Sequence, residues 1–380
     1  MAWVALQVTG ASGGMDATAV GQAATVTGEN ASLGNRWQRW TALPTTTTST
    51  TALPTDTTLT TLPATTTTST TAPPTLPPTT TTSTTTTSTT LPPPSQSKAA
   101  SVLGVYAGPA SASLITRTNT LVGHQVRYAM DFLDGTSWAT ISDPSWFLSQ
   151  WQGTGYQMIW GVPMLPNSGA SLDVGATGAY NQYFETLSAA LVAGGQGSSI
   201  IRLGWEFNGG WFPWAAKGHA ASFVAYWRQI VDSMRSVPGA NFKFEWNPTR
   251  SDLGVGDLAN YYPGDAYVAI VGLDVYDTEW GSYPGAVAEW HRMLTQSYGL
   301  DWLASFGAAH GKRLAIPEWG LGWSGNGMFG GGDNAYFVQQ MANWVNSNNV
   351  ANVIAWQYGS NQLPDASQAP NATAALAQDF

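Results

Sequence analysis

The chain has 380 residues, of which 43% are hydrophobic and only 10% are charged, and its formal net charge is −9. This acidic balance argues against a nucleic-acid partner or an anionic membrane surface, because both are bound by clustered Lys and Arg, and no stretch is apolar for long enough to predict a membrane-spanning helix. The sequence contains no cysteine, which excludes disulfides, thiol nucleophiles and cysteine-based zinc sites.

The first 98 residues differ in composition from the rest of the chain. Residues 1–42 contain short alternating patches typical of strands and no signal-peptide pattern; they are too few for a complete β-sandwich but compatible with the remnant of a β-rich carbohydrate-binding module. Residues 43–98 are mostly Thr, Ser and Pro, and TTTTSTT recurs from Thr45, Thr65 and Thr79. Such a segment buries too little apolar surface to fold, which predicts a disordered linker. Linkers of this kind usually tether a catalytic domain in an exported enzyme, so we expect a secreted protein.

Residues 99–380 alternate β-type runs with helical stretches. Several runs are almost continuously apolar, which is typical of parallel strands buried on both faces. Between them, Phe223, Trp227 and Met234 follow a helical period, as do Phe337, Met341 and Trp344. A doubly wound sheet is the alternative, but no GxGxxG follows the first run. The pattern therefore predicts an α/β fold, a (β/α)8 TIM barrel. Its eight runs are 101–108, 125–132, 156–165, 199–207, 242–248, 267–276, 313–320 and 352–359.

Two carboxylates stand where apolar runs end. The active site of a barrel lies at the C-terminal ends of its strands, and Glu206 ends the fourth run while Glu318 ends the seventh. Alternation puts Glu206 on one face with Arg202, and Glu318 on one face with Ile316, so the carboxylates converge if these faces point inward. Paired carboxylates suit glycosidic cleavage, in which one protonates the leaving oxygen and the other stabilises or attacks the anomeric carbon. A structural ion pair with Arg202 or Arg250 is the alternative.

This arrangement resembles the clan A glycoside hydrolases, in which the acid/base ends strand 4 and the nucleophile ends strand 7. Within the clan it resembles family 26, whose members are mainly endo-β-1,4-mannanases with some lichenases and β-xylanases. The matching positions, within roughly residues 100–380, are Arg202, Glu206, Gly209, Trp211, Trp214, Tyr276 in Gly272-Leu-Asp274-Val-Tyr276, and Glu318-Trp319-Gly320. The resemblance implies a retaining double displacement with Glu206 as acid/base and Glu318 as nucleophile. It also implies that Tyr276 orients Glu318 and that Arg202 adds positive charge.

One position departs from the family pattern. The family usually has His immediately before the acid/base, and this chain has Trp205 there. Because that His takes part in sugar recognition in relatives, the substrate stays open between β-mannan, which the family favours, and a β-1,4- or mixed-linkage glucan or a xylan. The two-carboxylate mechanism is unaffected.

The chain also has 19 tryptophans, more than a core requires, because each buried indole N–H needs a partner. We interpret several as flat platforms for sugar rings, with core packing as the alternative for each one. Asn208 and Asp274 are candidates for bonds to sugar hydroxyls, with a structural acid as the alternative for Asp274. The predicted sugar contacts are Trp205, Asn208, Trp211, Trp214, Trp246, Asp274, Trp323 and Trp356.

Other enzyme classes fit the sequence less well. The four His residues are scattered and form no HExxH motif, so we expect no metal and no other cofactor. A noncatalytic carbohydrate-binding barrel would keep the aromatic platforms, but it would not need both carboxylates. The sequence therefore predicts a monomeric endo-hydrolase with a polysaccharide as its partner.

Overall fold

The computed structural model describes residues 97–323, 328–357 and 367–380. The predicted N-terminal segment 1–42 and all but the last two residues of the predicted linker 43–98 lie outside these ranges. Within them, no helix combines the length and the apolar character that crossing a membrane requires.

Eight parallel strands close into a barrel, and each of them lies within or overlaps one of the predicted runs, which confirms the (β/α)8 prediction. The hydrogen-bonded order is β10-β1-β2-β3-β4-β5-β6-β8, and a β10–β8 pairing closes the ring. The barrel strands are β1 (Leu103–Tyr106), β2 (Tyr128–Phe132), β3 (Gln157–Val162), β4 (Ile200–Leu203), β5 (Lys243–Trp246), β6 (Ile270–Gly272), β8 (Arg313–Leu321) and β10 (Val350–Trp356). The fourth, sixth, seventh and eighth barrel strands are thus β4, β6, β8 and β10.

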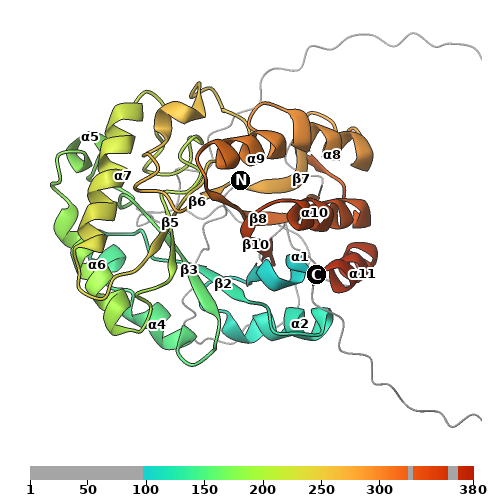
Figure 1. Ribbon diagram of the computed structural model, residues 1–380, viewed down its shortest axis with the longest axis horizontal. Coiled ribbons are helices and arrows are strands. Elements are labelled where there is room, and N and C mark those ends of the chain that lie inside the picture. Colours follow the sequence, from blue (N-terminus) through green and yellow to red (C-terminus); the bar gives the residue numbers. More distant parts are fainter. Residues whose placement is uncertain (1–96, 324–327, 358–366) are drawn as a thin grey trace, which may run out of the picture. The chain divides into compact units, whose positions relative to one another are not determined.

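Helices surround the strands, as Figure 1 shows. The two helices predicted from apolar spacing are present as α7 and α10, and Asn334 caps α10 by accepting a hydrogen bond from the Phe337 N–H. The helices are α1 (Lys98–Val102), α2 (Ala112–Val122), α3 (Trp138–Ser142), α4 (Ser145–Trp151), α5 (Leu172–Gly175), α6 (Asn181–Ala193), α7 (Ala220–Arg235), the 3-10 helix η1 (Leu258–Tyr261), α8 (Ala286–Thr295), α9 (Leu300–Ala309), α10 (Ala335–Ser347) and α11 (Pro370–Asp379).

The core has two layers because successive side chains of a strand point to opposite faces. Outward side chains pack against the helices in one large cluster. Inward side chains fill the barrel axis in a second, smaller cluster, which includes Met130, Ile200, Ala315 and Ile354. Which cluster a strand residue joins therefore shows whether it faces the barrel interior.

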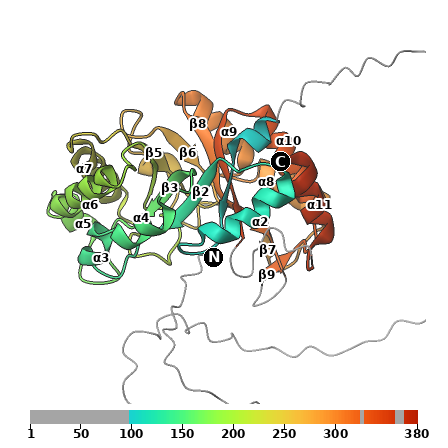
Figure 2. The same cartoon turned by 90° about the horizontal axis from the view of Figure 1, so that it is seen from below.

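One strand continues beyond the barrel rim. After β6 the chain breaks for Leu273 and Asp274 and resumes as β7 (Val275–Trp280), which first pairs with the end of β8. It then pairs antiparallel with β9 (Met328–Gly330), and both lie at the lower edge of the coloured ribbon in Figure 2. We call β7 and β9 together the β7–β9 ribbon. The sequence did not predict it, since β9 has only three residues.

Candidate active site

Arg202 and Glu318 meet inside the barrel. Arg202 lies on β4 and is completely buried, with its Nη1 donating to Glu318 Oε1 at 2.7 Å and its Nη2 to Asp274 Oδ2 at 2.5 Å. Tyr276, on β7, donates from its hydroxyl to Glu318 Oε2 at 2.7 Å. Each carboxylate oxygen of Glu318 therefore has its own donor, which fixes the plane of the group.

A bulge in β8 turns Glu318 inward. Leu314 and Ile316 pack in the outer cluster, and Ala315 in the inner one, so simple alternation would point Glu318 outward. The expectation that Ile316 and Glu318 share an inward face is therefore wrong. Against β10, Val353 pairs with Ile316 and Ala355 with Trp319, which leaves one extra residue on β8. A bulge of this kind shifts the alternation by one residue and so redirects the next side chain.

Strand alternation does not explain the position of Glu206 either, because this residue lies beyond the end of its strand. β4 ends at Leu203, and Glu206 lies in the turn that follows, with a left-handed φ of 50°. Its N–H donates to the backbone oxygen of Asn247 at 2.8 Å, which ties the turn to the end of β5. Left-handed backbone is rare and costly for a residue with a side chain, and such strain gathers at functional sites. Gly204 begins this turn at a φ of 56°, and a Cβ there would stand 2.2 Å from Met164 Sδ.

The indole N–H of Trp211 donates a hydrogen bond to Oε2 of Glu206 at 2.8 Å. Gly209 allows this contact, because a Cβ at that position would stand 2.3 Å from the Trp211 ring. Glu206 is 1% exposed and Glu318 is 2% exposed, but only Glu318 contacts a cation. The two carboxyls therefore occupy electrostatically different environments.

The pKa values of Glu206, Tyr276 and Arg202 are all shifted by this environment. Burial raises the pKa of Glu206, and the nearby charge of Glu318 adds to the rise, while Arg202 and the Trp211 bond oppose it. Burial and the Glu318 carboxylate also raise the pKa of Tyr276 well above its ordinary value, which keeps its hydroxyl protonated as a donor. Burial alone would lower the pKa of Arg202, but Asp274 and Glu318 raise it overall, so the guanidinium stays charged.

Two predicted sugar contacts lie close to Arg202 and Tyr276. Trp356 ends β10 and packs in the inner cluster, with its ring centroid 6.2 Å from that of Tyr276. Trp205 is 6% exposed and lies over Arg202, whose guanidinium carbon is 5.8 Å from the indole centroid. Both thus border the residues that hold Glu318, and Trp205 also shields the buried cation.

Other predicted tryptophans pack in the outer layer. Trp246 is fully buried, and its N–H donates to the Tyr261 backbone oxygen. Trp214 is 3% exposed and donates to the Trp205 backbone oxygen. Sugar rings could not stack on either indole in this arrangement, so for these two core packing is the better interpretation. Trp323 is half-buried just after β8 and packs against the outer cluster.

The two polar candidates serve the framework. The Asn208 amide donates to the backbone oxygens of Thr249 and Ser251 and accepts from the Thr249 N–H, so its hydrogen-bonding groups join two loops. Asp274 is 1% exposed and binds Arg202, which favours the structural interpretation of this acid.

Sequence reasoning missed three residues around Arg202. The Asn247 side chain accepts from Arg202 Nε at 2.6 Å, and Phe132 lies 5.6 Å from the guanidinium carbon. Glu245, on the inner face of β5, is fully buried and accepts from Asn352 Nδ2 at 3.0 Å, and burial raises its pKa to about 7. A polar residue in an otherwise apolar run was the available signal for Glu245. In the described residues, no group of three His, Asp or Glu side chains is placed to hold a metal ion.

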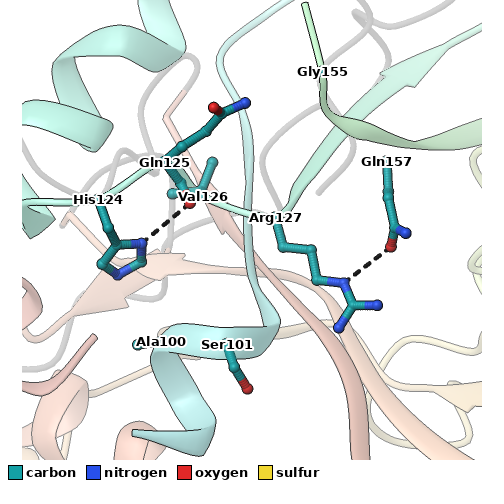
Figure 3. A pocket seen from close by; sticks show the side chains of 8 residues that line it. All are labelled: Ala100, Ser101, His124, Gln125, Val126, Arg127, Gly155 and Gln157. Atoms are coloured by element: carbon teal, nitrogen blue, oxygen red, sulfur yellow. Dashed lines mark hydrogen bonds between the residues drawn. The ribbon is translucent and has the colours of Figure 1, made fainter. Parts of the chain in front are cut away.

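A surface cavity of about 460 Å³ lies away from this site, beside the N-terminal ends of β2 and β3. Figure 3 shows Arg127 Nε donating to Gln157 Oε1 at 3.0 Å and the His124 ring against the Gln125 backbone oxygen. The cavity has no carboxylate in its lining and sits at the end of the barrel opposite to Glu206 and Glu318.

Comparison with known proteins agrees with this geometry. The family model described as Glycosyl hydrolase family 26 matches residues 192–323, the stretch that contains both carboxylates. Over 26% of this chain and 10% of the relative, the sequence is 33% identical to Endoglucanase H of Acetivibrio thermocellus. Over 32% of this chain and 12% of the relative, it is 29% identical to Mannan endo-1,4-beta-mannosidase of Bifidobacterium adolescentis.

The matched segments thus span about a tenth of the length of these two relatives. Among solved structures, GH26C from a Muricauda species is similar with a TM-score of 0.53 and 15% identity, over 74% of this chain and 85% of that one, which supports the fold. The barrel of this chain therefore resembles glycosyl hydrolase family 26 in the segment carrying Arg202, Glu206, Tyr276 and Glu318.

Proposed function

We propose that the barrel cleaves a β-1,4-linked polysaccharide by double displacement with retention of configuration. The observation that carries the proposal is the unequal setting of the two buried carboxyls: Glu318 is held by Arg202 and Tyr276, whereas the pKa of Glu206 is raised by burial. Retaining cleavage needs one ionised nucleophile and one protonated acid at neutral pH. The environments match these two roles.

Glu318 attacks the anomeric carbon, and the glycosidic bond breaks as Glu206 gives its proton to the leaving oxygen. Glu206, now ionised, removes a proton from water, and the water oxygen attacks the anomeric carbon and releases Glu318. Arg202 and Tyr276 position the nucleophile and stabilise its charge before and after each step. Asn247 helps to position both Arg202 and Glu206. Its side-chain oxygen accepts a hydrogen bond from Arg202, and its backbone oxygen accepts one from the Glu206 N–H.

For the substrate we propose β-mannan first. One aligned relative is named a mannan endo-1,4-beta-mannosidase, while the other is named an endoglucanase, which keeps a β-glucan as the second candidate. The Trp205 indole, which stands where family 26 usually has His, lies beside Arg202 and so borders the residues that hold Glu318. We further propose that the enzyme acts outside the cell as a monomer, the role for which a Thr-rich linker is typical.

The test is product release from β-mannan, glucomannan, mixed-linkage β-glucan, carboxymethylcellulose and β-xylan, with Glu318→Ala as the paired control. Oligosaccharides released from mannan by the wild type but not by the variant would support the proposal. Cleavage of a glucan or xylan alone would support the mechanism but replace mannan as the proposed substrate. NMR of the first product anomer tests the mechanism: the β-anomer is expected, and an α-anomer would exclude double displacement. No release from any of the polymers would contradict the hydrolase proposal for these substrates.

Chemical rescue separates the two roles. With an activated aryl glycoside, azide should restore turnover of Glu206→Ala and yield the β-glycosyl azide, because it attacks the glycosyl-enzyme formed on Glu318. With Glu318→Ala, azide replaces the nucleophile itself and should yield the α-glycosyl azide. The reverse pairing of variant and product would exchange the roles of Glu206 and Glu318.

A further inference from the structure

The β7–β9 ribbon exposes an indole at the rim of the barrel. Trp280, the last residue of β7, is 62% exposed, although most tryptophans of the described chain are buried or half-buried. We propose that Trp280 is a stacking platform for a sugar ring of the polysaccharide, at a distance from the bond that is cut. This inference rests on the proposed function and adds a distal binding site to it.

The first support is the position of Trp280 along β7. Tyr276, on the same strand, contacts the nucleophile candidate Glu318, and β7 pairs in register with β8 over Val275–Asp277 and then with β9 over Thr278–Trp280. Because alternate residues share a face, Trp280 lies on the Tyr276 side of the strand, about 13 Å further along it. A chain of sugars bound at Glu318 and running along β7 would therefore reach the indole.

The second support is that the opposite face of the ribbon is fixed. Glu279 lies on the face of β7 opposite to Tyr276 and forms ion pairs with Arg250 and with Arg292 of α8. Arg250 also binds the buried Glu289 of α8 at 3.0 Å and donates to the Thr278 backbone oxygen. These contacts anchor β7 to the helix layer, so Trp280 is presented by a held strand, and its own side chain loses only two torsions when a ligand covers it.

The third support is the chemistry of the exposed surface. On the same face, Met328 stands opposite Trp280 and Gly330 opposite Thr278, so this face carries no charged side chain along the β7–β9 ladder. A protein interface needs about 800 Å² on each side, which one indole beside one methionine does not supply. A neutral sugar ring fits this face, since its C–H groups are attracted to the negative face of an aromatic ring.

The test compares Trp280→Ala with wild type on a short substrate and on the polymer cleaved in the panel above. We expect kcat/KM to be unchanged on an aryl glycoside or a trisaccharide, and to fall about three- to tenfold on the polymer, mainly through KM, as for the loss of one aromatic contact. Trp280→Tyr should recover part of the loss. The matched control is Trp146→Ala, which removes a 50% exposed indole from α4 and should leave both values unchanged.

Equal kcat/KM of Trp280→Ala and wild type on the polymer would overturn the inference while leaving the hydrolase proposal intact. So would an equal loss on both substrates with a lowered melting temperature, because that pattern indicates a structural role. Migration in gels that contain the same polymers gives a readout independent of turnover. If wild type cleaves none of the polymers but is retarded by one of them, and Trp280→Ala is not retarded, the binding role of Trp280 is supported and the hydrolase proposal is refuted. If wild type is neither active nor retarded, both proposals are refuted.

Discussion

Replacing Tyr276 with Phe removes a single hydrogen bond from the proposed nucleophile. The ring that packs against Trp356 is kept, and only the hydroxyl that donates to Glu318 Oε2 at 2.7 Å is lost. A hydrogen bond to a charged group contributes about 1.5–3 kcal/mol. Because each 1.36 kcal/mol is a factor of ten in rate, kcat/KM should fall about ten- to a hundredfold if the bond contributes this energy to the transition state and not to the free enzyme. The measurement is initial rate on the polymer that the wild type cleaves.

Tyr262→Phe is the matched control for this substitution. Its hydroxyl also donates to a carboxylate, that of Asp265 at 2.9 Å, but the pair lies among exposed groups away from Glu318. We expect unchanged kcat/KM for the control and a melting temperature close to that of wild type for both variants. Wild-type activity in Tyr276→Phe would refute the argument that this hydroxyl holds the nucleophile. A large fall in melting temperature would instead show that the hydroxyl serves the fold.

Two further predictions concern pH. Burial raises the pKa of Glu245 from 4.5 to about 7. The stability that its protonated form contributes is therefore present below pH 4.5 and is lost as the pH rises through 7. The expected loss in the free energy of unfolding is on the order of 3 kcal/mol. Glu245→Gln, which can still pair with Asn352, should lack this loss when the free energy of unfolding in urea is compared at pH 5 and pH 8; the same loss in both proteins would disprove it. In Trp211→Phe, removal of the N–H donor that lowers the pKa of Glu206 should move the alkaline limb of the kcat/KM profile to higher pH. A shift to lower pH would contradict the acid role of Glu206.

The barrel could be predicted because its strands are short, apolar and regularly spaced. Burial on both faces demands continuous apolar runs, and each such run in residues 99–380 became a barrel strand. The β7–β9 ribbon was not predictable in this way. β9 has three residues, and its pairing depends on where β7 leaves the barrel, which is a tertiary property rather than a local one.

The converging carboxylates were predicted from a correct rule about strand ends and an incorrect one about alternation. The bulge at the end of β8 and the left-handed backbone at Glu206 both redirect side chains, and neither has a signature in residue periodicity. Pro317 is the one local hint, because proline cannot donate to a sheet and favours irregular positions. Special backbone geometry of this kind is expected where a site is built.

The tryptophans show the same limit. Trp246 and Trp356 both end barrel strands and cannot be told apart by composition, yet one joins the outer cluster and the other the inner one. What separates them is the phase of the alternation on each strand, which the sequence leaves open when both faces are apolar. Residue type identified a set of candidates for sugar contact, and only the fold could divide it.

The extra residue on β8 has a consequence for how this site changes during evolution. Substitution can replace Glu318 but cannot reposition it, whereas a change at Pro317 that let β8 pair with β10 without a bulge would restore regular alternation from Ile316 and point the carboxylate at the helices. The sequence would keep almost every residue that recognition by motif relies on, while the barrel lost its nucleophile. Among homologues, the residue between Ile316 and Glu318 is therefore as informative about loss of function as the two carboxylates themselves.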